Sequence, residues 1–146
     1  MEFTTLTLRD LDEVKDLFTS VFTQEPWNDD WSDEAQLTAY LTDLMGNPNS
    51  LAFGLRSGGE LIAASLGSVR HWYQGTEYYM DEFFIRADWQ GKGLGRSFLE
   101  KAEEALKERG IHVLFLLTEK DVPAYGFYTH LGFRESEGNT AFHMTF

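Results

Sequence analysis

The strongest architectural signal in this chain is the sequence Phe83-Phe84-Ile85-Arg86-Ala87-Asp88-Trp89-Gln90-Gly91-Lys92-Gly93-Leu94-Gly95-Arg96. It predicts a strand, a short loop rich in glycine, and the first turn of an amphipathic helix. Glycines at alternate positions remove Cβ atoms, so that backbone N–H groups can converge on one spot. The start of the helix adds unpaired N–H groups and the positive end of its dipole. This combination predicts a site for a polyanion such as a pyrophosphate.

Two common phosphate-binding patterns do not fit this loop. A P-loop requires Lys followed by Ser or Thr after the last glycine, whereas Arg96 and Ser97 stand there. A dinucleotide-binding fingerprint normally follows the first strand of a βαβ unit, whereas several antiparallel strands are expected before this loop. A tight turn that only connects two elements stays open as the plain alternative.

The whole chain, residues 1–146, is expected to form one mixed α/β domain. Apolar alternation, helical spacing and turn signals predict the order β-αα-βββ-α-β-α-ββ, with a sheet of about six or seven strands. The strand at 112–118 is apolar on both faces, as a central strand would be. The other expected strands are 3–8, 51–56, 61–69, 77–86, 133–135 and 140–146. Four helices are expected: the first at 11–22, the second capped by Ser32 and stopped by Gly46, the third at 93–109, and the fourth from Pro123 to near Gly132.

Composition predicts an acidic globular protein without cysteine. The chain is 42% hydrophobic and has a net charge of −12, so no basic patch is available to displace counterions from nucleic acid. The same charge suits a cationic substrate, although many proteins are simply acidic. The absence of Cys excludes disulfides and thiolate chemistry, and the spacing of the four His residues suggests no metal site. With no signal peptide and no membrane span in view, a cytoplasmic protein is expected.

Two motifs together resemble the GNAT superfamily of acyl-CoA-dependent N-acyltransferases. Residues 90–95, Gln-Gly-Lys-Gly-Leu-Gly, match its Gln/Arg-x-x-Gly-x-Gly/Ala motif. Residues 124–133, Ala-Tyr-Gly-Phe-Tyr-Thr-His-Leu-Gly-Phe, resemble its second signature, and a helix and a buried strand are expected between the two. The resemblance implies the GNAT fold, a mostly antiparallel mixed sheet that splays at the cofactor site and is flanked by about four helices.

The resemblance also implies acetyl-CoA as co-substrate, without a metal. In the family, loop amides hold the CoA pyrophosphate and the pantetheine arm lies against the strand before the loop, where a backbone amide polarises the thioester carbonyl. An Asp stands at position 121, where many members carry Asn facing the cofactor. The implied cofactor-binding residues are Phe83, Phe84, Ile85, Gln90, Gly91, Lys92, Gly93, Leu94, Gly95, Arg96, Asp121 and Phe127.

Acyl transfer to an amine needs a base for the ammonium and an acid for the leaving thiolate. The run from Asp81 to Ile85 resembles the acid-acid-Phe-Phe-Val run of spermidine/spermine acetyltransferases, in which the first acid acts through water. Strand alternation is expected to put Asp81 and Glu82 on opposite faces, so that only one faces the site, and the choice between them stays open. Tyr128 matches the tyrosine that protonates the thiolate in much of the family; the alternative is a core aromatic residue.

The acceptor is expected near the first two helices, their connecting loop and the hairpin loops. Acids and aromatic rings there suit a cationic amine through charge pairing and cation–π contact. Anchoring of the loop on the core and capping of the next helix explain the same residues equally well. The implied acceptor residues are Glu25, Trp27, Asp29, Asp30, Trp31, Trp72 and Tyr73.

These signals together predict an N-acetyltransferase that moves an acetyl group from acetyl-CoA to a primary amine by direct transfer in a ternary complex. The expected acceptor is a small cationic amine, of the polyamine or aminoglycoside type. Two alternatives remain: acetylation of protein N-termini or lysines, and a non-catalytic CoA-binding sensor. Homodimerisation through the C-terminal strands, common in the superfamily, is left open.

Overall fold

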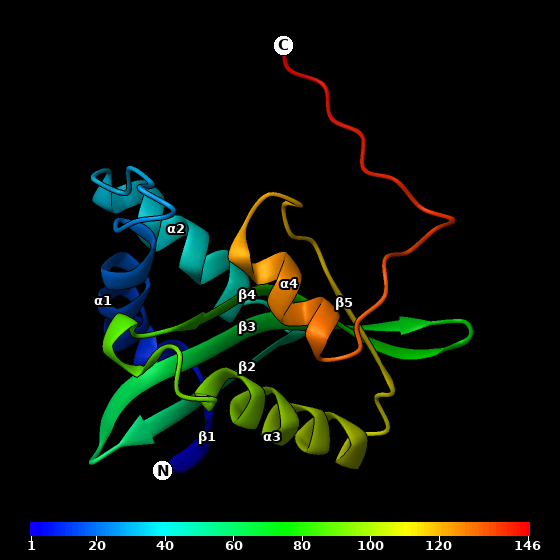
Figure 1. Cartoon of the computed structure of the whole chain (residues 1–146), viewed down its shortest axis with the longest axis horizontal. Helices are drawn as coiled ribbons and strands as arrows, with labels where there is room; N and C mark the ends of the chain where they lie inside the picture. Colours follow the sequence, from blue (N-terminus) through cyan, green and yellow to red (C-terminus); the bar gives the residue numbers. More distant parts are fainter.

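Five strands form one mixed sheet in the order β1-β2-β3-β4-β5, and the computed structural model describes all residues from 1 to 146 (Figure 1). Neighbouring strands run antiparallel except for β4 and β5, which are parallel. The predicted fold class is therefore confirmed. The strands are β1 (Glu2–Leu6), β2 (Ser50–Ser57), β3 (Glu60–Trp72), β4 (Gly75–Ile85) and β5 (Val113–Leu116).

Four helices cover the two faces of the sheet, in agreement with the predicted number. They are α1 (Leu11–Phe22), α2 (Glu34–Met45), α3 (Leu94–Glu108) and α4 (Pro123–His130). The N-cap of α2 is Asp33 and not the predicted Ser32, because the Asp33 carboxylate accepts the N–H of Gln36 at 3.1 Å. None of these helices combines the length and the apolar character needed to cross a bilayer.

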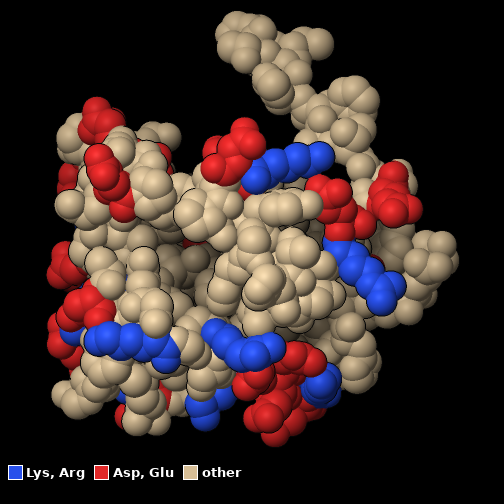
Figure 2. Space-filling view, viewed as in Figure 1, with Lys and Arg blue, Asp and Glu red and all other residues tan.

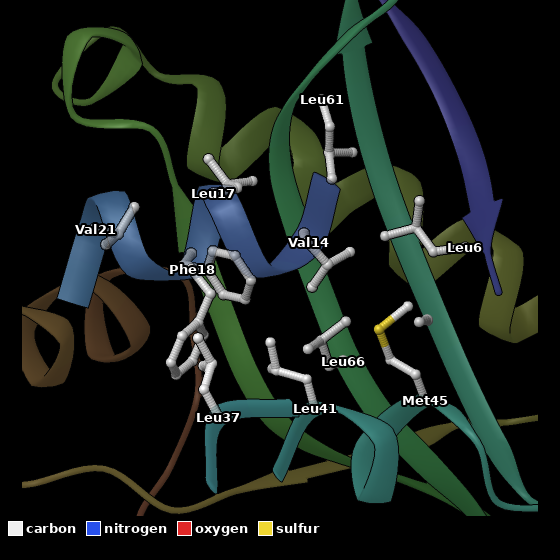
Figure 3. Packing of buried hydrophobic residues seen from close by; sticks show 13 residues of the cluster. Leu6, Val14, Leu17, Phe18, Val21, Leu37, Leu41, Met45, Leu61 and Leu66 are labelled. Carbon is white, nitrogen blue, oxygen red and sulfur yellow. The ribbon is translucent and has the colours of Figure 1, made fainter. Parts of the chain in front are cut away.

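One apolar cluster attaches α1 and α2 to the sheet. Val14 of α1, Leu41 of α2 and Leu66 of β3 are all fully buried, and Figure 3 shows the two helices packing together across the strands at this point. A buried leucine or valine contributes about 1.5–3 kcal/mol through removal of its apolar surface from water. Phe84, near the end of β4, belongs to the same cluster.

A second apolar cluster lies on the opposite face. Phe98 and Leu99 of α3 pack there against Tyr78 and Met80 of β4. Tyr128 of α4 packs against this cluster too, so that α3 and α4 share one face of the sheet. The end of β4 thus contacts both layers, since Phe84 belongs to the first cluster and Phe83 and Ile85 pack against the second.

A β-bulge at Asp81 switches the faces of β4. The register between β3 and β4 shifts by one residue between Met80 and Glu82, which leaves Asp81 without a partner. In a regular strand, side chains two residues apart share a face, so Tyr78, Met80 and Phe84 would all point the same way. Here Tyr78 and Met80, before the bulge, face α3, whereas Phe84, after it, faces α1 and α2. The bulge therefore decides which side chains of this strand reach which layer.

The parallel pair β4 and β5 separates halfway along β4. Pairing runs from Glu77 with Val113 to Met80 with Leu116 and then ends, whereas β4 continues to Ile85. Residues 81–85 consequently have a neighbouring strand only on the β3 side. Alternate backbone groups of this segment are left without a partner, as expected for the predicted splay.

Two of the predicted strands do not form. Residues 133–135 and 140–146 have no strand partner, and the red C-terminal segment in Figure 1 runs away from the sheet. Alternating side chains favour an extended chain, but a strand also needs a hydrogen-bonded neighbour. The prediction of six or seven strands was therefore too high, and β5 is an edge strand rather than a central one.

Gly67, which lies opposite the bulge, has no room for a side chain. A Cβ there would lie 2.3 Å from the backbone oxygen of Tyr79 and 2.6 Å from Cζ of Tyr78. We expect Gly67→Ala to lower the free energy of unfolding by about 2 kcal/mol, since a strand carbonyl cannot move aside freely. Urea denaturation measures this change. Gly138→Ala, whose Cβ would meet nothing within 4 Å, is the control, and equal stability of the two variants would contradict the account.

Candidate functional site

The loop between β4 and α3 has the backbone of an anion-binding site. Gly91 and Gly93 have φ angles of +73° and +76°, a region that other residues rarely adopt, and a Cβ at either would point into open space. The first hydrogen bond of α3 runs from the N–H of Ser97 to the oxygen of Gly93, at 3.2 Å. The amides of residues 94–96 precede this bond, and Gly93 offers no side-chain cap. An anion is a suitable acceptor for them.

The third glycine of the loop permits close packing. A Cβ at Gly95 would lie 3.1 Å from Cδ1 of Ile85 and 3.1 Å from the ring of Phe127. The start of α3 therefore approaches both the end of β4 and helix α4. The ring of Phe127 also stacks on Phe83, with centroids 6.0 Å apart. The structure thus brings these predicted cofactor-binding residues together.

Gln90 fixes the loop to the end of β4. Its side-chain Nε2 donates a hydrogen bond to the backbone oxygen of Ile85 at 2.7 Å. Arg86, just before the loop, forms ion pairs with Asp88 and with Glu60 at the start of β3. One N–H of the Gln90 carboxamide is therefore used within the chain.

Exposed basic side chains accompany the loop. Lys92 lies with Nζ 5.6 Å from the ring centroid of Trp89, and Arg96 makes a loose ion pair of 3.7 Å with Glu100. Figure 2 shows basic side chains, in blue, along the stretch where the loop leads into α3. Asp121 lies exposed on the turn before α4, without a hydrogen bond or an ion pair. The loop therefore offers both amides and cations to an anion.

The two candidate bases have different surroundings. Asp81 occupies the bulge and is more open to solvent than Glu82. Partial burial raises the pKa of the Asp81 carboxyl, and the nearby Arg70 opposes this rise. Glu82 is half-buried and accepts a hydrogen bond of 2.6 Å from the hydroxyl of Tyr40. The bulge, and not simple alternation, gives the two carboxylates their different environments.

The surroundings of Glu82 disfavour the ionised form of its carboxyl. Burial is the main reason that the pKa of Glu82 is raised above its ordinary value, and the negative charges of Asp81 and Asp29 raise it further. The hydrogen bond from Tyr40 acts in the opposite direction. A carboxylate with a raised pKa is a better proton acceptor than an ordinary one, which suits a general base.

Tyr128 lies in an aromatic environment on α4. Its ring packs edge-on against Phe133 at 5.3 Å and against Phe83 at 6.4 Å. Burial raises the pKa of Tyr128, and the charge of Glu82 raises it further. The hydroxyl therefore stays protonated at neutral pH, and its pKa depends on the charge of Glu82, one of the two candidate bases.

A broad groove of about 1800 Å³ runs along β5 and connects parts of the site. It lies where β4 and β5 have separated, and α3 and α4 form its sides. Among the residues that line it are Tyr40, Asp81, Leu116, Tyr125 and Tyr128. Asp81, the candidate acid Tyr128 and Tyr40 therefore border one open space, whereas Glu82 is not among the residues that line it.

The loop between α1 and α2 carries most of the predicted acceptor residues. Trp27 packs edge-on against Phe22 at 5.6 Å, and Trp31 packs against Phe18 at 5.3 Å, so both rings anchor the loop on the core. The side chain of Ser32 and its backbone N–H, the latter at 3.0 Å from Asp30, lower the pKa of the Asp30 carboxyl. The side chains of Glu25, Asp29 and Asp30 are exposed. No group of three or more His, Cys, Asp or Glu side chains that could hold a metal ion occurs in the chain.

Trp72 and Tyr73 lie elsewhere. They occupy the tip of the β3–β4 hairpin, where they are 58% and 82% exposed and pack against each other. Trp72 pairs with Gly75, which is about 23 Å from Glu82 along β4 at the usual rise of a strand. The structure therefore does not bring these two residues together with Trp27 and Trp31.

Tyr40 was not among the site residues predicted from the sequence. Its ring lies on the core-facing side of α2 and packs against Phe18, with centroids 6.1 Å apart. The hydrogen bond to Glu82 joins positions 42 residues apart and leaves no local signal. An inward-facing tyrosine among leucines was the only indication that a buried polar partner was needed.

Comparisons with known proteins agree with the geometry. The model of the Acetyltransferase (GNAT) family matches residues 11–133. An aminoglycoside N(6')-acetyltransferase type 1 of Stenotrophomonas maltophilia is 27% identical over 81% of this chain and 79% of its own length. An uncharacterised N-acetyltransferase of Chlorobaculum tepidum is 38% identical, over 36% of this chain and only 32% of its own length.

Solved structures share the fold over nearly the whole chain. One is an aminoglycoside acetyltransferase from an uncultured soil metagenomic sample in complex with sisomicin, with a TM-score of 0.75 and 18% identity over 99% of this chain and 95% of the other. Another is a predicted acetyltransferase of Clostridium acetobutylicum with acetyl-CoA, with a TM-score of 0.75 and 16% identity over 97% and 95%.

Glu82→Gln should make the fold more stable at neutral pH. Because the pKa of Glu82 is raised on folding, the folded chain binds this proton more firmly than the unfolded chain, and stability falls as the pH rises through the folded pKa. We therefore expect the variant to melt at a higher temperature than wild type near pH 7 and the two to converge below about pH 4. Glu108→Gln, at the exposed end of α3, is the control. A wild-type chain that melts higher at pH 7 would refute the prediction.

Proposed function

This chain belongs to the acetyltransferase (GNAT) family, and on that basis we propose that it transfers an acetyl group from acetyl-CoA to the primary amine of a small cationic molecule. The observation that carries the proposal is that Glu82 and Tyr128 both border the unpaired segment of β4, since Glu82 belongs to it and the ring of Tyr128 packs against Phe83. One is a half-buried carboxylate with a raised pKa, and the other is a tyrosine that stays protonated and senses that carboxylate. A base and an acid with these properties suit direct acyl transfer.

The glycine loop is the proposed binding site for the pyrophosphate of acetyl-CoA. The free amides of residues 94–96 and the side chains of Lys92 and Arg96 would neutralise its charge. The unpaired backbone of residues 81–85 offers hydrogen bonds to the amide groups of pantetheine. The fold shared with the Clostridium acetobutylicum structure that contains acetyl-CoA supports this choice of co-substrate.

The proposed reaction uses Glu82 as base and Tyr128 as acid. Glu82 accepts a proton from the substrate ammonium, and the neutral nitrogen attacks the carbonyl carbon of the thioester. The carbon–sulfur bond breaks, and the leaving thiolate takes the proton of the Tyr128 hydroxyl. The nitrogen loses its second proton, which restores the Tyr128 hydroxyl through water, and Glu82 releases the first proton to solvent. Backbone amides between Phe83 and Ile85 would stabilise the charge on the carbonyl oxygen. Asp81 is the second candidate for the base.

The proposed acceptor carries several positive charges. Exposed acids of the loop between α1 and α2, Glu25, Asp29 and Asp30, would attract such a molecule, and the net charge of −12 acts in the same sense. The Stenotrophomonas maltophilia relative and the structure with sisomicin support aminoglycosides as the first class to test. Polyamines present the same chemistry and form the second class.

Gly93→Ala should weaken the binding of CoA about tenfold, because a methyl group at a φ of +76° strains the loop and points into the space proposed for the pyrophosphate. Isothermal titration calorimetry with CoA measures the dissociation constant. Gly110→Ala is a matched control, since Gly110 has a φ of +75° at the far end of α3 and the same backbone strain. Equal affinity in both variants would remove the loop from the cofactor site.

The release of thiol from acetyl-CoA in the presence of aminoglycosides, polyamines and acetylatable peptides tests the reaction. We expect turnover with one of the two small-amine classes and a loss of about 100-fold in kcat for Tyr128→Phe and for Glu82→Gln. Asp81→Asn is the comparison for the base and should retain at least about a tenth of wild-type activity.

Other outcomes identify the alternatives. Turnover on peptides alone would replace the small amine by a protein N-terminus or a lysine. Tight CoA binding without turnover on any amine would indicate a sensor and refute the enzymatic role. Full activity of Tyr128→Phe would remove the acid from the scheme.

A further inference from the structure

A single hydrogen bond connects helix α2 to the proposed base. The hydroxyl of Tyr40 donates to Oε1 of Glu82 at 2.6 Å, across the gap between the helix and strand β4. No other side-chain hydrogen bond of the chain reaches this carboxylate. Oε2 is thereby left for another partner, and Oε1 is fixed in direction.

The ring of Tyr40 is held on two sides. Trp31 stacks on it with centroids 5.4 Å apart and an angle of 20° between the rings, and Phe18 packs against it at 6.1 Å. Trp31 in turn packs edge-on against Phe18 at 5.3 Å, which closes a triangle of three aromatic rings. The hydroxyl at the end of such a clamped ring has little freedom to turn away from Glu82.

Trp31 occupies this position at some cost. Its indole Nε1 is buried and has no hydrogen-bond partner. A buried donor without an acceptor is unfavourable and rare, so packing against Tyr40 and Phe18 must decide where the ring lies. The stacking of Trp31 thus fixes the position of the Tyr40 ring, while the unpaired indole N–H lowers the stability of the fold.

Every other charged neighbour of Glu82 disfavours its ionised form. Asp81 on the same strand and Asp29 on the loop between α1 and α2 both raise its pKa, in addition to burial. Tyr128 on α4 is near enough for the charge of Glu82 to raise its pKa, and as a neutral group it adds no charge of its own. Burial and the charge of Glu82 raise the pKa of Tyr40 as well, so that its hydroxyl keeps its proton and remains a donor. Tyr40 is the one group here that stabilises the carboxylate.

We propose that Tyr40, clamped by Trp31, is a positioning residue that orients Glu82 toward the amine and keeps its carboxylate ionised. This inference rests on the proposed function, in which Glu82 is the base. Tyr40 also borders the groove, but in the scheme it contacts no reacting atom and acts through Glu82. The clamp also joins the base to the loop that carries the acceptor-side acids, since Trp31 belongs to both.

Titration of Glu82 without any substrate is the first test. In protein labelled with ¹³C at the glutamate side-chain carboxyl, NMR follows each carboxyl through its pKa, and the spectrum of Glu82→Gln assigns the signal. Tyr40→Phe keeps the ring and removes the hydroxyl, so the midpoint of Glu82 should move to higher pH. Trp31→Leu removes the stacking partner and should move it in the same direction by less. An unchanged midpoint in Tyr40→Phe overturns the inference whatever the substrate proves to be.

The pH profile of kcat/KM is the second test. On the acidic limb, where Glu82 controls the rate, Tyr40→Phe should lose about tenfold, whereas on the plateau it should stay within about threefold of wild type. Tyr78→Phe is the matched control, because it removes a buried hydroxyl that bonds to the oxygen of Leu51 at 2.9 Å and does not touch Glu82. A structural effect alone would lower the whole profile equally in both variants and would refute the positioning role.

A double variant separates failure of the inference from failure of the proposed function. If Tyr40 acts through Glu82, adding Tyr40→Phe to Glu82→Gln should cause no further loss of activity. A further tenfold loss would assign Tyr40 a separate role and overturn the inference. If Glu82→Gln alone is fully active, the proposed base is wrong, and the NMR titration still decides whether Tyr40 controls the Glu82 carboxyl.

Discussion

The hydrogen bonds between β4 and β5 end at Met80 and Leu116, and the rest of the site depends on that separation. Past this point residues 81–85 have a partner strand on one side only, and a groove opens between the two strands. In water an unpaired strand edge is a liability, because it invites association with other chains. Here the edge lies inside the molecule, between α3 and α4, where a ligand can use the free backbone groups.

The two layers of the fold supply different parts of the chemistry. The face with α3 and α4 carries the glycine loop and Tyr128, whereas the face with α1 and α2 carries Tyr40, Trp31 and the acidic loop. Glu82 lies at the junction, and its half-buried side chain has only one hydrogen bond within the chain. Its raised pKa and the unpaired indole of Trp31 both reduce stability. Such local violations of good packing are typical of functional sites.

Features with a local cause were accessible to sequence analysis. Glycine at 91 and 93 and the turn at residues 57–59 have strong backbone preferences, and the structure places a tight connection at each. The contact between Tyr40 and Glu82 has no such cause, because it depends on how α2 lies across the sheet. The expected strand at 140–146 failed for the opposite reason: its alternation is real, but no neighbouring strand accepts its hydrogen bonds.

The bulge at Asp81 makes the site sensitive to the number of residues in β4 as well as to their identity. Loss of one codon there would restore plain alternation, and every side chain from Glu82 to Ile85 would exchange faces. Phe84 would leave the cluster under α1 and α2, and Glu82 would leave Tyr40 at the same moment. The same strand register therefore positions both the core residue Phe84 and the proposed base Glu82. Natural variation in this strand should therefore occur as replacement of residues, while insertions and deletions are confined to the loops at its ends.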